Sequence, residues 1–323
     1  MRGAGDQPLA CAPLAERREV RGVSMQLERR VVDVGLVEVE GLRIAVRAVQ
    51  PIRDSARLGT ADDRDLLAQQ GGQCVADIIG AGIVPGGMEM MDRPAISAAE
   101  DFVHAGYPLD VEALLIVELD GPGVEVDHLI GRVEAIALQN GSTTCRVSTS
   151  EQERLTFWAG RKAAFPAVGR ISPDYYCMDG TIPRKELPRV LAGMRDLSEQ
   201  YGLGVANVFH AGDGNLHPLI LYDANVPGEL DKAEAFGADI LRLCVKVGGV
   251  LTGEHGVGVE KRDLMGEMFS EADLDQQMRV KCAFDPNHLL NPGKVFPQLR
   301  RCAELGRMHV HRGQLAFPDI PRF

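Results

Sequence analysis

Apolar and polar positions repeat with two different periods along this chain, and the changes between them mark the predicted elements. Apolar residues three and four apart predict long amphipathic helices at residues 184–201 and 230–247, each followed by glycine. Residues 113–119 and 205–209 are short apolar runs of the kind found in strands. Shorter patterns predict strands at residues 84–90, 143–148, 175–182 and 217–222, and helices at residues 73–80, 96–103, 124–139, 150–164 and 274–284.

The order of these elements predicts an α+β fold. Helices and strands interleave, but their spacing is too irregular for repeated βαβ units. A Gly-Asp-Gly turn joins the strands at residues 205–209 and 217–222, which predicts an antiparallel hairpin. We therefore expect an α+β sandwich, with an antiparallel sheet on one side and helices on the other.

The pattern changes character near residue 73. Residues 1–72 mix arginine, acidic residues, glycine and proline with a valine-rich alternation at residues 30–40, without a regular succession of helices and strands. We expect residues 1–72 to be an edge ribbon or an irregular, poorly ordered lead-in. Residues 73–323 form the expected main domain.

Composition narrows the class of protein. The chain has 323 residues, of which 45% are hydrophobic and 25% charged, so it can bury a sizeable core. A net charge of -11 argues against a nucleic-acid partner, which would need a basic face. Seven dispersed cysteines argue against a disulfide framework and favour the reduced cytoplasm. No apolar stretch approaches the roughly 20 residues of a spanning helix, so we expect no direct membrane insertion.

The candidate chemistry lies in two glycine-rich segments. His210 and His217 bracket the Gly-Asp-Gly turn, and Gly-Glu-His-Gly-Val-Gly follows at residues 253–258. An odd spacing along an uninterrupted strand puts side chains on opposite faces. Gly212 and Gly214 tolerate positive φ, however, and permit a tight reversal. Both imidazoles can then face one point.

Two imidazoles and a carboxylate are ordinary ligands for a divalent metal, and three protein ligands leave positions open for substrate or water. We predict His210, His217 and Glu254 as these ligands, with zinc as the first expectation and manganese or iron as alternatives. His255 is then free to act as a general base, because its ordinary pKa of about 6.5 lies close to working pH. A hairpin with two incidental histidines is the other interpretation.

Three motifs carry a resemblance to the C-terminal domain of FAD-linked 2-hydroxyacid dehydrogenases: residues 210–217, residues 253–258, and Phe-Asp-Pro-Asn-His-Leu-Leu-Asn-Pro-Gly-Lys at residues 284–294. This group includes D-lactate and D-2-hydroxyglutarate dehydrogenases and the flavin-linked subunit of bacterial glycolate oxidase. Residues 172–183 and the tail at residues 301–311 resemble the glycolate oxidase subunit more narrowly. The similarity runs from about residue 73 to the end of the sequence.

The resemblance implies a ferredoxin-like α+β cap domain that closes over a flavin ring and carries the substrate pocket. It places His210, His217 and Glu254 at metal-ligand positions. It places His255 at the position of the base. In such a reaction the metal polarises the 2-hydroxyl group, the base takes its proton, and hydride passes from the substrate to FAD.

Three further residues fall on functional positions of the group. Asn215 matches a substrate-pocket position, and Asn291 lies in a motif that approaches the flavin. Arg161 matches an arginine that pairs with the substrate carboxylate, for which a planar guanidinium is well suited. A surface arginine near the end of a helix is the alternative interpretation of Arg161.

The resemblance also implies the substrate and partners: glycolate or a related D-2-hydroxyacid, and the other flavin and iron-sulfur subunits of a glycolate oxidase complex. We expect a cytoplasmic protein that associates with the membrane through such partners. Two other classes remain open. One is a non-catalytic module that joins the subunits of an oxidase complex, and the other is a flavin-independent metallohydrolase with the same ligands.

One feature departs from the group. Residues 1–72 contain no glycine-rich loop for the FAD pyrophosphate and do not resemble a flavin domain. We therefore expect a truncated chain that is inactive alone. We hypothesise that the reading frame is interrupted upstream and that residues 1–72 are partly out-of-frame sequence.

Overall fold

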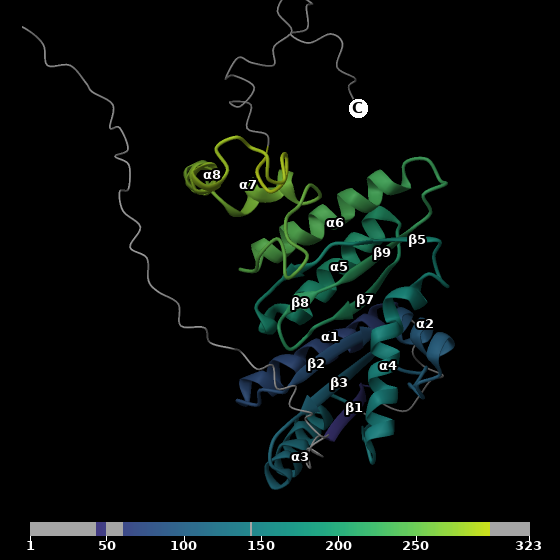
Figure 1. Cartoon of the computed structure of the whole chain (residues 1–323). Helices are drawn as coiled ribbons and strands as arrows, with labels where there is room; N and C mark the ends of the chain where they lie inside the picture. The colour runs from purple at the N-terminus through teal and green to yellow at the C-terminus, as the bar shows by residue number, and fades with distance from the viewer. Residues whose placement is uncertain (1–42, 50–60, 143, 298–323) are drawn as a thin grey trace, which may run out of the picture. The chain divides into compact units, whose positions relative to one another are not determined.

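The computed structural model describes residues 43–49, 61–142 and 144–297 (Figure 1). Two segments that entered the sequence-based expectations lie outside these described residues. They are the valine-rich residues 30–40 and the tail at residues 301–311. Within the described residues, no helix combines the length and the apolar character needed to cross a lipid bilayer.

The centre of the fold is a seven-stranded sheet in the order β4-β1-β3-β2-β7-β9-β5, and every pair of neighbours is antiparallel. Its strands are β1 (Arg43–Val49), β2 (Gly87–Asp92), β3 (Ala113–Leu119), β4 (Thr144–Val147), β5 (Asp174–Cys177), β7 (Val205–Phe209) and β9 (Pro218–Tyr222). A second, two-stranded sheet pairs β6 (Gly180–Thr181) with β8 (Asn215–Leu216).

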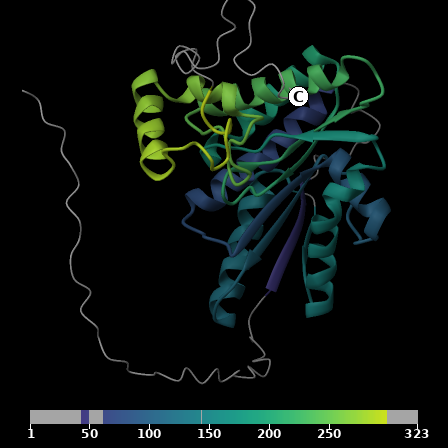
Figure 2. The same cartoon turned by 45° about the horizontal axis from the view of Figure 1, so that its top comes forward.

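Helices cover both faces of the large sheet. They are α1 (Ala61–Gly80), α2 (Arg93–Val103), α3 (Gly123–Gln139), α4 (Glu151–Val168), α5 (Leu187–Tyr201), α6 (Glu229–Lys246), α7 (Met265–Met268) and α8 (Glu271–Phe284). Short 3-10 turns, η1 (Arg184–Glu186) and η2 (Arg262–Leu264), precede α5 and α7. Residues of α1, α3, α5 and α6 pack on one face, and residues of α2 and α4 on the other. Both views show β1 and β3 between α3 and α4 (Figure 2).

The α+β class and the antiparallel sheet are confirmed, but the expectation of helices on one side only is wrong. The reason lies in β3, whose side chains alternate between two buried clusters. Leu115 and Val117 face the cluster with α1 and α3, whereas Leu114 and Ile116 face the cluster with α2 and α4. A strand that is apolar on both faces needs cover on both.

The first described helix is longer than its sequence pattern suggests. We expected it at residues 73–80, but α1 begins at Ala61. Gly71 and Gly72 weaken the helical pattern, but at both positions a neighbouring element lies so close that a side chain would be crowded. A Cβ atom at Gly71 would lie 3.0 Å from the Cβ of Ala113, and one at Gly72 would lie 3.1 Å from the backbone nitrogen of Pro188. The two glycines let α1 approach β3 and α5 closely.

Asp92 links the end of β2 to α2 and β7. Its side chain caps α2 by accepting from the backbone N–H of Ala95 (3.2 Å), and it accepts from the backbone N–H (2.9 Å) and side-chain amide (2.8 Å) of Asn207. Burial raises the pKa of Asp92 from 3.8 to about 7, although these hydrogen bonds act in the opposite direction. The folded protein therefore holds a proton that the unfolded chain releases.

We expect Asp92 to make the fold less stable as the pH rises. Between about pH 4 and pH 7 the folded state binds more protons than the unfolded state, so the free energy of unfolding falls with increasing pH. Over this interval the wild-type protein should lose on the order of 2–4 kcal/mol relative to the Asp92→Asn variant. Urea denaturation of both proteins across the interval measures the difference in slope, and parallel curves would refute the raised pKa.

Candidate metal centre and substrate site

Glu89 on β2, His210 just after β7 and His217 just before β9 present polar side chains on the face of the sheet that α4 covers. Successive side chains alternate between faces, so Glu89 lies on the same face as Met91, which packs in the cluster with α4. By the same rule His210 shares the face of Val208, and His217 that of Leu219. The ring of Phe165, from α4, contacts the ring of His217 edge-on at 5.7 Å.

The turn between β7 and β8 brings the two histidines to one face. Asn215 and His210 exchange backbone hydrogen bonds of 3.0 and 3.2 Å, which closes the loop. Gly214 adopts φ +72°, and a Cβ atom there would lie 2.2 Å from the carbonyl oxygen of Ile182. Gly212 does not have a positive φ. Its N–H donates to the carbonyl oxygen of Met88 (2.8 Å) and ties the turn to β2.

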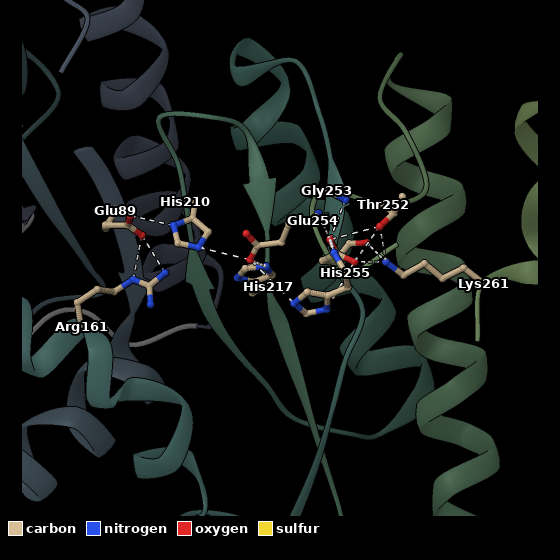
Figure 3. A network of polar contacts seen from close by, with 10 residues as sticks. Glu89, Arg161, His210, His217, Thr252, Gly253, Glu254, His255 and Lys261 are labelled. Atoms are coloured by element: carbon tan, nitrogen blue, oxygen red, sulfur yellow. Dashed lines mark hydrogen bonds and ion pairs between the residues drawn. The ribbon is translucent and has the colours of Figure 1, made fainter. Parts of the chain in front are cut away.

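His210, His217 and Glu254 meet at the end of this hairpin. The Oε1 atom of Glu254 lies 3.1 Å from Nε2 of His217 and 3.8 Å from Nε2 of His210 (Figure 3). One ligand atom from each of the three residues lies within 4.8 Å of the others. Ligand atoms around a tetrahedral zinc ion are about 3.3 Å apart, as the usual zinc–nitrogen distances require. The expected convergence is therefore present, and the role of these residues as ligands stays a prediction.

The burial, the missing hydrogen bonds and the lowered pKa of His217 all suit a ligand of a divalent metal. Its side chain is buried, and among the described residues neither ring nitrogen has a hydrogen-bond partner. Burial lowers the pKa of His217 to about 4, with a further contribution from His210, so the ring is neutral at pH 7. A buried polar group without a partner costs about 1–3 kcal/mol. A metal ion bound to the lone pair of Nε2 would remove part of this cost.

The loop that carries Glu254 and His255 is shaped by Asp179, which lies between β5 and β6. Asp179 is fully buried. Its Oδ2 atom accepts hydrogen bonds from the backbone N–H groups of Gly253 (2.7 Å), Glu254 (2.6 Å) and His255 (3.0 Å). These three bonds fix the direction in which Glu254 and His255 leave the backbone.

Lys261 balances the charge of Asp179. It is 1% exposed, forms an ion pair with Oδ1 of Asp179, and donates to the Asp179 carbonyl oxygen (2.7 Å) and to Oγ1 of Thr252 (3.1 Å). Burial alone would raise the pKa of Asp179. The hydrogen bonds from Lys261 and from the backbone of His255 and Glu254 outweigh burial and hold that pKa well below its usual range. Asp179 is thus an ionised buried carboxylate.

His255 lies beside the three candidate ligands. Its ring stacks on that of His217, with centroids 5.0 Å apart, and its Nδ1 atom is 3.6 Å from Oδ1 of Asp179. Its side chain is 44% exposed, unlike that of His217. Asp179, His217 and His255 also lie close enough to hold a metal. The oxygens of Asp179 already accept from an ammonium and three N–H groups, so we disfavour this second set.

Arg161 projects from α4 toward Glu89 and ends a row of polar side chains that contact one another in turn. The row consists of Arg161, Glu89, His210, Glu254, His217, His255, Asp179 and Lys261. Arg161 is 6% exposed, so the interpretation as a surface arginine is wrong. Its Nε and Nη2 atoms lie 2.9 and 2.8 Å from Oε2 of Glu89, and Oε1 of Glu89 is 2.9 Å from Nδ1 of His210. The hydrogen bond to Glu89 raises the pKa of His210. Figure 3 shows the row, which runs from Arg161 at one end to Lys261 at the other.

A cavity of about 380 Å³ opens beside this row. Its lining residues come from β6, the hairpin turn and the loop after α6: Thr181, His210, Asp213, Asn215, Gly253 and Glu254. Asn215 is 7% exposed, and its Oδ1 atom has no hydrogen-bond partner among the described residues. A Cβ atom at Gly253 would lie 2.0 Å from that oxygen. Only glycine permits this approach of the loop to Asn215.

Asn291 is the one predicted site residue that the described structure does not bring to the row. It lies in the loop after α8 with φ +47°, it is exposed, and its Oδ1 atom accepts from Nζ of Lys294 (3.2 Å). No contact links it to the histidines, Glu254 or Arg161 among the described residues. Its expected approach to the flavin stays a prediction.

Sequence reasoning missed three residues of the site, namely Glu89, Asp179 and Lys261. Glu89 carried a signal, because a charge inside the apolar run of β2 is unusual for a buried strand. Asp179 falls inside residues 172–183, which supported the resemblance but gave no role for the carboxylate. Nothing in the sequence around Lys261 indicated that it belongs to the site.

With this geometry established, comparison with known proteins identifies the family. The family described as "FAD linked oxidases, C-terminal domain" matches residues 67–295. The chain belongs to this FAD-linked oxidase family. Some proteins similar to this chain have names that state a particular enzyme.

The glycolate oxidase subunit GlcD of Escherichia coli (strain K12) is 60% identical over 255 residues, which are 79% of this chain and 51% of that protein. The subunit of the same name from Bacillus subtilis (strain 168) is 34% identical over 224 residues, 69% of this chain and 48% of that protein. This FAD-linked oxidase chain thus spans about half the length of the curated relatives it matches.

Solved structures confirm the fold. A 4-ethylphenol oxidase from Gulosibacter chungangensis superposes with a TM-score of 0.54 at 16% identity, over 80% of this chain and 54% of that one. p-Cresol methylhydroxylase superposes with a TM-score of 0.55 at 14% identity, over 79% and 52% of the two chains. At such low identity the likeness shows the α+β fold of this FAD-linked oxidase domain alone.

Proposed function

We propose that this chain is the substrate- and metal-binding part of a flavin-dependent dehydrogenase that oxidises glycolate or a related D-2-hydroxyacid to the 2-oxoacid. The observation that carries the proposal is the cluster of His210, His217 and Glu254, with His255 against it and Arg161 in the same row. The names of the Escherichia coli and Bacillus subtilis relatives support glycolate as the first substrate to test.

In this proposal Nε2 of His210, Nε2 of His217 and a carboxylate oxygen of Glu254 hold the divalent metal. Zinc is the first candidate for two nitrogens and one oxygen, and manganese and iron are the next. A bound metal acts as a Lewis acid that makes the 2-hydroxyl group of the substrate more acidic. His217 suits this task because its ring is already neutral and desolvated.

The charges of the site suit a substrate with one negative charge. Arg161 and Lys261 supply two positive charges, and Glu89, Asp179 and Glu254 supply three negative charges. With neutral histidines the row carries one net negative charge, which a divalent cation would change to one positive charge. A monoanionic 2-hydroxyacid would then complete a neutral site, whereas a neutral ester would not.

His255 is the proposed base that takes the proton of the 2-hydroxyl group. One ring nitrogen, Nδ1, lies 3.6 Å from Oδ1 of Asp179, so the other nitrogen, Nε2, is the one proposed to take the proton. The side chain is partly open to solvent, which gives the proton a way out. Stacking on His217 holds the ring against the candidate metal ligands.

Arg161 and Asn215 are the proposed groups that hold the substrate. The guanidinium of Arg161 would bind the substrate carboxylate, and its buried position makes such a contact stronger than it would be in water. Asn215 lines the cavity beside His210 and Glu254, and within the described part of the chain its Oδ1 atom has no hydrogen-bond partner. That oxygen can accept a hydrogen bond from a substrate hydroxyl group.

FAD would accept the hydride. We propose that a flavin domain outside residues 73–323 holds most of the cofactor, and that Asn291 approaches the flavin ring. Residues 1–72 stay proposed as a lead-in to the cap domain, although within them β1 and the start of α1 already belong to its fold. Other flavin and iron-sulfur subunits of a glycolate oxidase complex are the proposed partners. A cytoplasmic location, with membrane association through those partners, completes the proposal.

A calorimetric titration of the purified chain tests this function. We expect glycolate to bind only when zinc or manganese is present, and we expect no reduction of an artificial electron acceptor by the chain alone. Arg161→Leu should weaken glycolate binding by about 10- to 100-fold, the loss expected for a hydrogen bond to a charged group. Arg154→Leu is the matched control, because Arg154 also projects from α4 and pairs with a strand glutamate, Glu118 (3.2 Å).

The outcome separates the three classes of function. Metal-dependent hydrolysis of a model ester, without glycolate binding, would contradict the proposal and favour a metallohydrolase. A tight complex with glycolate oxidase subunits, but no metal and no glycolate binding, would favour an interaction module. Equal weakening by Arg161→Leu and Arg154→Leu would remove Arg161 from the substrate site.

A further inference from the structure

Glu89 is a buried carboxylate with two different partners. It lies on β2 and is 8% exposed. The register that pairs Met90 with Phe209, continued by one residue, brings Glu89 opposite His210, which directly follows β7. A carboxylate in such a position is costly unless it is paired. Glu89 meets this requirement with one partner on each oxygen.

The contact with His210 decides which ring nitrogen faces the candidate metal. Oε1 of Glu89 is 2.9 Å from Nδ1 of His210, so the favoured tautomer carries its hydrogen on Nδ1 and donates it to Glu89. The lone pair is then on Nε2, the atom that faces Glu254 at 3.8 Å. Histidines that bind metals generally donate their other N–H group in this way, which fixes the ring and increases its basicity.

The contact with Arg161 fixes the guanidinium. Nε of Arg161 donates to Oε2 of Glu89 (2.9 Å), whereas Nη2 lies 2.8 Å from the same oxygen as an ion pair and has no hydrogen-bond partner among the described residues. The remaining nitrogen, Nη1, makes no hydrogen bond or ion pair within the described part of the chain. Figure 3 shows Glu89 between Arg161 and His210, with contacts to both. A long side chain held by one hydrogen bond and one ion pair loses much of its rotamer freedom before any ligand arrives.

We propose that Glu89 is a positioning residue that prepares both halves of the site at once. One oxygen sets the tautomer and direction of the metal ligand His210, and the other aims Arg161 at the substrate carboxylate. This inference deepens the proposed function and rests on it. Metal affinity and substrate affinity therefore both depend on a side chain that contacts neither the metal nor the substrate.

The test is the affinity of the folded chain for zinc, measured by competition with a chromophoric chelator, together with the visible spectrum of the cobalt-loaded protein. Glu89→Gln keeps the shape but removes the charge, and we expect it to weaken zinc binding by about 10- to 100-fold, as substitutions of such outer partners do. The cobalt spectrum should change because the orientation of His210 changes. Glycolate binding at saturating zinc should weaken at least about tenfold, because Arg161 loses its anchor.

Glu118→Gln is the matched control. Glu118 also lies on a central strand, pairs with an α4 arginine, Arg154, at 3.2 Å, and is partly buried. A merely structural role of Glu89 would lower the thermal stability of both variants and leave the zinc affinity and cobalt spectrum of the folded proteins unchanged. We expect the Glu118→Gln spectrum to match the wild-type spectrum.

A second variant covers the case in which Glu89→Gln does not fold. Glu89→Asp keeps the charge but shortens the side chain, so that it cannot reach His210 and Arg161 together. We expect this variant to fold and to bind zinc at least about tenfold more weakly than the wild type. Zinc affinity within threefold of wild type in either folded variant would overturn the inference. Absence of zinc binding by the wild-type chain would instead overturn the proposed function itself.

Discussion

Alanine in place of His217 is expected to abolish specific binding of a divalent metal. His217 is the only one of the three candidate ligands that is almost fully buried, and apart from the 3.1 Å approach of Nε2 to Glu254 its nitrogens have no polar partner among the described residues. Loss of an outer partner of a ligand costs about 10- to 100-fold in metal affinity, so loss of the ligand itself should cost about 100-fold or more. Zinc titration of His217→Ala against a chelator measures this loss directly.

The fold should survive this substitution, because the His217 ring makes no hydrogen bond within the described residues and so contributes little favourable polar energy. We expect a cavity cost of about 2–3 kcal/mol at most, from the lost contacts with Phe165 and the neighbouring histidines. His128→Ala is the control, since His128 is an exposed histidine on α3. Metal occupancy equal to wild type in folded His217→Ala would remove His217 from the proposed ligand set.

Methionine in place of Lys261 is expected to produce the largest loss of stability. Lys261 and Asp179 are both fully or almost fully buried, and they neutralise each other. Removal of one member of such a pair leaves an uncompensated buried charge and costs about 3–5 kcal/mol. The loop with Glu254 and His255 should loosen as well, because Asp179 holds its backbone. Urea denaturation at pH 7 measures the free energy of unfolding.

The pH of this measurement matters because the pKa of Asp179 is lowered in the folded state. Its contribution to stability is fully present above its ordinary pKa of about 4, and is lost only as the pH falls through the lowered value. At pH 7 the whole effect of Lys261→Met is therefore visible. Lys162→Met, at an exposed position on α4, should change stability by no more than about 0.5 kcal/mol.

A double variant tests the reason for the loss. Asp179→Asn combined with Lys261→Met removes both charges, and we expect it to be more stable than Lys261→Met alone. The two single losses should therefore not add, as expected for residues in direct contact. Equal or lower stability of the double variant would show that the charge of Asp179 is not what Lys261 compensates.

The sequence was most informative where a local pattern determines the geometry. The spacing of His210 and His217 around Gly214 was enough to predict a hairpin with both imidazoles on one face, and the hairpin is present. The strand at residues 205–209 has the predicted bounds, because a glycine precedes it and the turn follows it. The α+β class followed from the same elements.

The missed residues depend on contacts between distant segments. Asp179 and Lys261 are 82 positions apart, and Glu89 and His210 are 121 positions apart, so no local period connects them. Their partners became visible only when strand register and loop direction were known. The two covered faces of the sheet are a different case, because the apolar run of β3 already contained that information.

The central claim is that His210, His217 and Glu254 bind one divalent metal ion. X-ray absorption at the zinc edge of the purified, zinc-loaded chain tests it most directly. We predict one bound zinc per chain, with two imidazole nitrogens at about 2.0–2.1 Å and carboxylate or water oxygens at about 2.0–2.2 Å. A spectrum with no imidazole scattering, or with sulfur in the first coordination shell, would contradict the account.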